Sequence, residues 1–310
     1  MRNRLLAFAL ATGIGLMAAA PADAATPSRI AVHFDLAKGQ QPENIAVAPD
    51  GTAYVTFAAA RQVAAISPKG TIRILATLPA PAEGGAAVPA LGFALTTGVV
   101  RTDDGTLYFL YASGDPATTG LYRLRPGYEP RRIAALPATG LPNGLAYDET
   151  AKTFYLTDSA LGTISAVPLK GGDVKVWSSA PELAAAGFLG ANGIKVRHGA
   201  IWATNLDRGT LLRIPITRGR PGPVQVKATG LAGIDDIAFA GVRDDQVIAT
   251  LNAPNKVVRI DAKGRAATLL TDGLQNPTSV AVRGRTVYVL SAAYLTATDP
   301  NLTISTLPRR

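Results

Sequence analysis

Cysteine is absent from this chain of 310 residues, and only two histidines, His33 and His198, occur in it. The missing thiols exclude a disulfide framework, a zinc site with cysteine ligands and a cysteine nucleophile. Two histidines leave little material for a serine–histidine triad or for a metal site built on several imidazoles. The chemistry of any site must therefore come from carboxylates, amides and hydroxyls, with or without a hard cation.

Clusters of basic residues are also scarce, although the formal net charge is +9. The lysines and arginines are scattered, and the only adjacent arginine pairs are Arg131-Arg132 and Arg309-Arg310. A nucleic-acid-binding surface gathers basic residues together with aromatic ones. We therefore expect a solvated basic surface and no nucleic-acid partner.

The N-terminus has the pattern of an export signal. Two arginines precede an apolar run over residues 5–20, and Ala22-Asp23-Ala24 follows as a small-x-small cleavage pattern. A membrane anchor is the alternative, but the run contains glycine and threonine and is short for a span of about 20 apolar residues. We predict a signal peptide over residues 1–24, a single domain over 25–310, and a periplasmic or secreted protein with no membrane attachment after cleavage.

Helical periodicity is missing from the rest of the chain, and an alternating strand pattern returns six times instead. The copies begin near residues 43, 96, 143, 192, 235 and 278, at intervals of 43 to 53 residues. A repeat of about 40–50 residues that holds four short strands is typical of a propeller blade. The sequence therefore predicts an all-β, six-bladed β-propeller with four-stranded blades, and one helical turn near residues 181–186.

The two ends of the chain supply complementary pieces of one blade. The sixth copy has only three strands, expected at 277–282, 286–291 and about 302–307. Residues 29–36 alternate like the outer strand of a blade. We predict that this N-terminal strand completes the sixth blade and closes the ring, which removes two exposed sheet edges.

The residues that open the six copies all carry a side-chain oxygen. They are Glu43, Thr96 or Thr97, Asn143, Asn192, Asp235 and Thr278. Equivalent positions of different blades converge at one mouth of a propeller's channel, and buried carboxylates there must be paired or bind a cation. Two carboxylates and two amides form an oxygen-only set that suits Ca²⁺.

We predict that Glu43, Asn143, Asn192 and Asp235 hold one divalent metal ion, most simply Ca²⁺, with Zn²⁺, Mn²⁺ and Mg²⁺ as alternatives. The competing interpretation is that these residues only cap strands, since Asn-Gly pairs are ordinary turn formers. Asp236 is interpreted as a further ligand, as a hydrogen-bond acceptor behind the ligands, or as a turn residue.

Short motifs around these positions resemble one family. They are Pro42-Glu43-Asn44, Leu141-Pro142-Asn143-Gly144-Leu145, Ala191-Asn192-Gly193-Ile194, Ile234-Asp235-Asp236-Ile237 and Asn276-Pro277-Thr278-Ser279. In order and spacing they are similar to the senescence-marker/gluconolactonase-like six-bladed propellers, which are related to paraoxonases and diisopropyl-fluorophosphatase. The resemblance implies that Glu43, Asn143, Asn192 and Asp235 match the metal ligands of the metal-dependent members.

The resemblance also implies a reaction, the metal-dependent hydrolysis of a lactone or related ester. Asp235 is then the first candidate to orient or deprotonate the attacking water, and Asp236 the second. The alternative is a non-catalytic, metal-containing binding propeller of the cell envelope. A quinone-dependent dehydrogenase on a similar propeller is disfavoured, because neither histidine falls where a channel base is needed.

The second copy departs from the family's pattern. Where sugar-lactone members carry arginine and asparagine, this chain has Thr96 and Thr97 with Phe93 nearby, and we predict these three as substrate-contacting residues. The apolar, glycine-rich stretch 84–93 either lines a mouth for a less polar ligand or is a connector. The expected partner is a small-molecule lactone or ester, and the expected state is a monomer.

Overall fold

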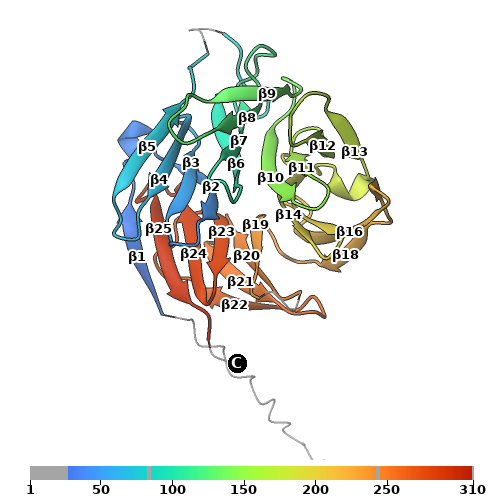
Figure 1. Ribbon diagram of the computed structural model, residues 1–310. Coiled ribbons are helices and arrows are strands. Elements are labelled where there is room, and N and C mark those ends of the chain that lie inside the picture. The colour runs from blue at the N-terminus through green and yellow to red at the C-terminus, as the bar shows by residue number, and fades with distance from the viewer. Residues whose placement is uncertain (1–26, 82–84, 242–244, 309–310) are drawn as a thin grey trace, which may run out of the picture.

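The computed structural model describes residues 27–81, 85–241 and 245–308, and it shows six β-sheets arranged around one axis (Figure 1). The predicted all-β, six-bladed propeller is confirmed. The signal peptide expected over residues 1–24 lies outside the described residues.

The first three blades follow one another along the chain as antiparallel four-stranded meanders. The first holds β2 (Pro42–Val47), β3 (Ala53–Phe57), β4 (Gln62–Ile66) and β5 (Ile72–Thr77). The second holds β6 (Leu95–Arg101), β7 (Leu107–Ala112), β8 (Gly120–Leu124) and β9 (Arg131–Ala135). The third holds β10 (Pro142–Asp148), β11 (Thr153–Asp158), β12 (Thr163–Pro168) and β13 (Lys175–Ser178).

The fourth blade is the largest, because a short extra strand pairs with its third strand. It holds β14 (Ala191–Arg197), β15 (Ala200–Asn205), β16 (Thr210–Thr217), the two-residue β17 (Arg220–Pro221) and β18 (Gln225–Ala228). The fifth holds β19 (Ile234–Phe239), β20 (Val247–Leu251), β21 (Lys256–Ile260) and β22 (Ala266–Leu270).

The sixth blade joins the two ends of the chain. It holds β23 (Pro277–Arg283), β24 (Thr286–Ser291) and β25 (Asn301–Thr306), and β1 (Ser28–His33) pairs antiparallel with β25 as the outer strand. Figure 1 shows this as the blue N-terminal strand lying beside the red C-terminal one. The predicted closure is confirmed, and it leaves no gap in the ring.

Helix is confined to two 3₁₀ turns in the described residues, η1 (Leu36–Lys38) and η2 (Pro181–Leu183). The second is the helical turn expected near residue 181. Across the described ranges, no helix has the length and apolar character needed to cross a bilayer.

Hydrophobic clusters fill each interface between neighbouring blades. Trp202 of the fourth blade packs with Ile237 of the fifth, for example, and Phe57 of the first packs with Leu290 of the sixth. Similar clusters lie between the remaining pairs. Each sheet is therefore covered on both faces, which explains why all six residues of β7 are buried. The packing fixes every blade, and so every inner strand, relative to its neighbours.

The inner strands β2, β6, β10, β14, β19 and β23 contact one another in sequence around the axis, and β23 contacts β2 to complete the circle. All six begin at the same end of the ring. We call this end the mouth, and the turns that join each inner strand to the second strand of its blade lie at the opposite end.

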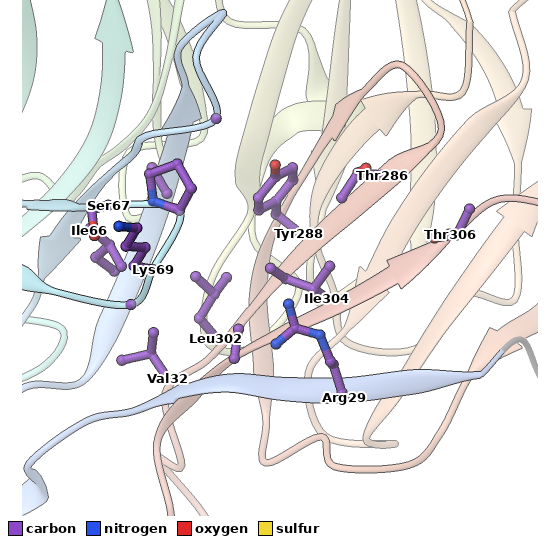
Figure 2. A pocket seen from close by; sticks show the side chains of 15 residues that line it. Arg29, Val32, Ile66, Ser67, Lys69, Thr286, Tyr288, Leu302, Ile304 and Thr306 are labelled. Atoms are coloured by element: carbon purple, nitrogen blue, oxygen red, sulfur yellow. The ribbon is translucent and has the colours of Figure 1, made fainter.

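A cavity of about 410 Å³ lies at the seam between the first and sixth blades (Figure 2). Arg29 of β1 and Lys69 of the β4–β5 turn stand at its edge, and Tyr288, Leu302 and Ile304 line it. The β4–β5 turn lies at the end opposite to the mouth. None of the predicted site residues lines this cavity, since they stand at or just before the first residues of the inner strands, at the mouth.

Candidate metal centre

Every inner strand is irregular at the residue that opens its repeat. The pairing register with the second strand shifts between Pro42 and Asn44 in β2 and between Pro142 and Leu145 in β10, and the other four inner strands shift at the matching place. Such a bulge leaves a residue outside the ladder and re-aims its side chain. The residues left unpaired include Glu43, Asn143, Asn192, Asp235 and Thr278.

In the second blade the shift falls between Thr96 and Val99, so that Thr97 and Gly98 stand outside the ladder. Thr97 is therefore the structural equivalent of Glu43. The sequence left the choice between Thr96 and Thr97 open, because the alternation of apolar residues fits both.

The two Asn-Gly pairs lie inside strands and are not turns. A Cβ atom on Gly144 would come 2.4 Å from the carbonyl oxygen of Asn192, and one on Gly193 would come 2.6 Å from that of Asp235. Neither glycine has a positive φ, so the requirement is space for the next inner strand. The glycines thus allow neighbouring blades to approach closely beside the asparagines.

Threonines of the second strands bridge the same positions. Thr204 accepts a hydrogen bond from Gly193 N at 2.8 Å and donates one to Asp235 O at 2.6 Å. Thr157 accepts from Gly144 N at 2.8 Å and donates to Asn192 O. These bonds link the third blade to the fourth and the fourth to the fifth, directly beneath three of the four predicted ligands.

Both predicted carboxylate ligands are buried, and each is held by one donor. Glu43 is 8% exposed, and its Oε2 accepts a hydrogen bond of 2.6 Å from the hydroxyl of Tyr294. Asp235 is 7% exposed, and its Oδ2 accepts one of 3.1 Å from Asn252 Nδ2. Within the described residues, the second oxygen of each carboxylate accepts no hydrogen bond.

The amide of Asn143 is oriented by a hydroxyl. Its Nδ2 donates to Ser159 Oγ at 3.1 Å, and Ser159 in turn donates its only hydrogen to Ala191 O at 2.7 Å. This network fixes which end of the amide is nitrogen, and it leaves Oδ1 as an acceptor. Asn192 is buried, and its side chain forms no hydrogen bond to any other described residue.

The two carboxylates influence each other electrostatically. Burial raises the pKa of Glu43 from its ordinary 4.5 to about 7. The hydrogen bond from Tyr294 lowers this pKa, and the nearby charge of Asp236 raises it. Burial and then the charges of Glu43 and Asp236 raise the pKa of Asp235 well above its usual value. The protein alone therefore resists holding both groups as anions, and a bound cation would relieve that resistance.

Asp236 occupies a different environment, and both of its oxygens have partners. Lys195 Nζ lies 2.7 Å from Oδ1, and Ser279 Oγ donates to Oδ2 at 2.6 Å. The carboxylate is almost completely buried. Of the three roles considered for Asp236, this geometry favours that of a hydrogen-bond acceptor behind the predicted ligands.

Sequence reasoning did not single out Lys195, Asn252, Tyr294 or Ser159. The only signal for Lys195 was a charge in the otherwise apolar run Ile194-Lys195-Val196. Tyr294 and Asn252 stand in loops outside the repeated pattern, so no register argument reaches them.

The predicted ligands agree in their chemistry with a divalent cation that prefers oxygen. No group of three His, Cys, Asp or Glu side chains in the described ranges is placed to hold a metal. The candidate set is instead mixed, with one unbonded oxygen each from Glu43, Asp235 and Asn143, and with Asn192 as the fourth side chain. Supporting donors that occupy only one oxygen of each ligand are a common feature of metal sites.

The predicted substrate residues behave differently from one another. Thr96 Oγ1 donates to Phe57 O at 3.0 Å and to Gln62 O at 3.1 Å, and Thr97 Oγ1 donates to Pro142 O at 2.8 Å. Both hydroxyls thus already join neighbouring blades. Phe93 is 40% exposed. Contact of these residues with a substrate stays a prediction.

Neither histidine belongs to the cluster. His33 Nδ1 lies 2.5 Å from Asp299 Oδ1, and His198 Nδ1 lies 3.3 Å from Asp245 Oδ1, with both rings mostly exposed. His198 stands in the turn after β14, at the end opposite to the mouth. The histidines therefore supply no base beside the predicted ligands.

Comparison with known proteins identifies the fold. No family model matches the chain, and no curated protein matches its sequence. Among solved structures, a calcium-binding protein, regucalcin from Agrobacterium tumefaciens, is 16% identical with a TM-score of 0.67, over 91% of this chain and 93% of that one. A gluconolactonase from Xanthomonas campestris is 13% identical with a TM-score of 0.65, over 93% and 97%.

A third similar structure has a different activity. Virginiamycin B lyase from Staphylococcus aureus is 19% identical with a TM-score of 0.60, over 87% of this chain and 82% of that one. Regucalcin and gluconolactonase are six-bladed propellers of the senescence-marker/gluconolactonase-like class, so the resemblance noted from the motifs extends to the fold. At these identities the likeness shows the fold alone, and the activity must be argued from the site.

We predict that the metal-free protein loses stability as pH rises from about 4.5 to about 7. The folded state raises the pKa of Glu43 to about 7, so it favours the protonated form, and that advantage disappears once the group must ionise. The loss from this group is at most about 3 kcal/mol. Urea unfolding in the presence of a chelator, followed at several pH values, measures it.

Glu43→Gln is the matched control, since it keeps the shape of the side chain and removes the titration. Its stability curve should be flatter over the same pH range, and saturating Ca²⁺ should flatten the curve of the unmodified protein. An identical slope in both proteins without metal would contradict the prediction.

Lys195→Met is predicted to reduce the free energy of unfolding by about 3–5 kcal/mol, because it leaves the buried Asp236 carboxylate without its counter-charge. Lys38→Met is the comparison, since Lys38 pairs with Asp35 at 2.9 Å on the surface with its side chain 74% exposed. That change should have little effect. If both variants lost the same free energy of unfolding in urea, Lys195 would not be compensating a buried charge on Asp236.

Proposed function

We propose that this chain is an exported, divalent-metal-dependent hydrolase of a lactone or related ester. The proposal is carried by the arrangement at the mouth, where the buried Glu43, Asp235 and Asn143 each have one supported polar atom and one unbonded oxygen. The fold shared with a gluconolactonase supports the substrate class.

The residues that would hold the cation are Glu43, Asn143, Asn192 and Asp235. An oxygen-only set favours Ca²⁺, with Mn²⁺, Mg²⁺ and Zn²⁺ as alternatives. When bound, such an ion supplies Lewis acidity toward a carbonyl oxygen and makes water more acidic.

The chain's own groups account for the proton transfers. Asp235 has Oδ2 fixed by Asn252 and Oδ1 unbonded, so it is the carboxylate best placed to accept a proton from the attacking water. Water adds to the carbonyl carbon, the C–O bond of the lactone or ester breaks, and the leaving oxygen takes the proton that Asp235 accepted. A lactone then gives a hydroxy acid, and an ester gives an acid and an alcohol. Asp236 is less suited to this role because Lys195 and Ser279 already occupy both of its oxygens.

We predict that Asp235→Asn lowers lactone hydrolysis at least 10²-fold, the low end of the range for a lost general base. Glu43→Gln should lower it as well, because the ion loses one of its two carboxylate ligands. The assay uses a panel of lactones, aryl esters and phosphotriesters with Ca²⁺, Mn²⁺ or Zn²⁺. The exposed carboxylate Glu149 supplies the matched control, and Glu149→Gln should retain full activity. Ca²⁺ titration calorimetry on the same variants separates loss of the ion from loss of chemistry.

Two outcomes decide between a hydrolase and a binding propeller. Hydrolysis that falls in both site variants, and not in Glu149→Gln, supports the enzyme. Ca²⁺ binding without turnover of any panel member contradicts it and favours the non-catalytic binding protein.

Export is proposed from the N-terminal pattern, in which arginines, an apolar run and Ala22-Asp23-Ala24 follow in order. The mature protein is expected to begin at Ala25 and to be found in the periplasm or the medium. Intact-mass measurement of the fractionated protein tests this, and a full-length chain in the cytoplasmic fraction would contradict it.

A further inference from the structure

Apolar side chains from five blades meet at the mouth. We call this cluster the apolar collar, and its buried members are Ala58, Val88, Leu95, Ala112, Leu141 and Leu189, with Ala90, Leu91, Ala160, Leu206 and Tyr294 packed against them. These residues belong to the first four blades and to the sixth. A contiguous cluster of this kind extends over the mouth end of the ring, in contrast to the six clusters that each fill one interface between blades.

The collar is continuous with the candidate metal centre. Tyr294 packs against the collar with its ring and donates its hydroxyl to Glu43 Oε2 at 2.6 Å. Leu141 directly precedes Pro142 and Asn143, and its backbone N–H bonds Asp158 Oδ1 at 2.9 Å. Any molecule that reaches the unbonded oxygen of Glu43 therefore lies next to Tyr294, whose ring packs against the collar.

Large apolar side chains are also exposed at this end. Phe93, Leu161, Phe188 and Leu295 lie in mouth loops with exposures of 40%, 45%, 56% and 69%. Among the other exposed large hydrophobic residues in the described ranges, Ile74, Val176 and Val226 lie on outer strands. Tyr128 is the one in the turns of the opposite end. The exposed apolar surface is thus concentrated at the mouth.

Two of these side chains are presented by loops with defined hydrogen bonds. Asp207 Oδ2 accepts from Phe188 N at 2.7 Å and from Ala186 N at 2.9 Å. Asn276 Oδ1 accepts from Leu295 N at 2.7 Å. Since the loops are fixed, the exposure of Phe188 and Leu295 is built into the fold and reduces the ordering cost of binding an apolar group.

The second-blade segment takes part in the same surface. Val88 is fully buried, and a Cβ atom on Gly114 would come 2.1 Å from Ala87 O, so this stretch packs tightly against the β7–β8 loop. The sequence left open whether residues 84–93 line a mouth or only connect two blades. The described part of this stretch, residues 85–93, favours the lining of a mouth. Thr96 and Thr97 of this blade do not offer their hydroxyl hydrogens to a sugar, because both hydroxyls donate to backbone carbonyls.

We propose that the substrate carries an aliphatic chain or an aromatic ring next to its lactone or ester group, and that the exposed Phe188 and Leu295, at the end of the ring that the apolar collar fills, bind this part. This inference rests on the proposed hydrolase function and names its substrate class. A polar sugar lactone would place hydroxyl groups against the exposed rings and chains of Phe188 and Leu295, whereas an alkyl or aryl group removes apolar surface from water on both sides.

The test uses the full mature protein with Ca²⁺ and a series of γ-lactones whose unbranched side chains have one to eight carbons. The value of kcat/KM should rise about two- to fourfold with each added methylene until the collar is covered, as expected for burial of apolar surface. Phe188→Ser and Leu295→Ser should each reduce this dependence on chain length. Tyr128→Ser, at the opposite end, should leave it unchanged.

A binding measurement separates this inference from the proposed reaction. The matching γ-lactams, which resist hydrolysis, are titrated into the same proteins by calorimetry. Lactam affinity that rises with chain length and weakens in Phe188→Ser supports an apolar ligand even if no lactone is hydrolysed, in which case only the hydrolase proposal fails. Hydrolysis that does not depend on chain length overturns the inference and leaves the hydrolase standing.

A third experiment tests whether the apolar surface at the mouth binds a lipid bilayer and not a substrate. Binding to phosphatidylcholine vesicles that is lost in Phe188→Ser, together with a flat response to chain length, would assign the surface to a lipid bilayer and overturn the inference. An equal effect of Tyr128→Ser and Phe188→Ser on the chain-length dependence would overturn it as well.

Discussion

The close packing of six inner strands around one axis is the constraint on which the rest of the structure depends. Each strand has a bulge at its first residues, and Gly144 and Gly193 leave space for the carbonyl groups of the next strand. Thr157 and Thr204 then connect the strands through hydrogen bonds. Side chains about 50 or 100 residues apart in the chain are held at one end of the ring by this repeated local geometry.

Charge is the second constraint, and it follows from the first. The packing brings Glu43, Asp235 and Asp236 close enough for their charges to affect one another. Lys195 supplies one internal positive charge, and its contact is with Asp236. Among the residues that the structure describes, the donors to Glu43 and Asp235 are neutral, namely the Tyr294 hydroxyl and the Asn252 amide. Two buried carboxylates without a counter-charge are unfavourable, so a divalent ion matches the charge that the protein leaves uncompensated.

The sequence was sufficient for the features that repeat. The interval between copies predicted six blades, and the missing strand of the last copy predicted the place of β1. The mouth positions of Glu43, Asn143, Asn192 and Asp235 followed from their register. The contacts that support them did not, because Tyr294 and Lys195 reach the cluster from a neighbouring blade and Asn252 lies in a loop outside the repeated pattern. The alternation of apolar residues also did not distinguish Thr96 from Thr97. A bulge shifts the pairing register, and the pattern of apolar residues does not show where that shift falls.

The fold itself leaves the activity open, because regucalcin, a gluconolactonase and virginiamycin B lyase all share it. The differences that matter lie at the mouth of the ring. Here Glu43 Oε1 and Asp235 Oδ1 accept no hydrogen bond from another described residue, while the collar beside them is apolar. A polar reacting group attached to an apolar substituent is the chemistry that satisfies both regions at once. The same tyrosine, Tyr294, contacts both regions, so the position of the carboxylate and the shape of the apolar surface are coupled through one side chain.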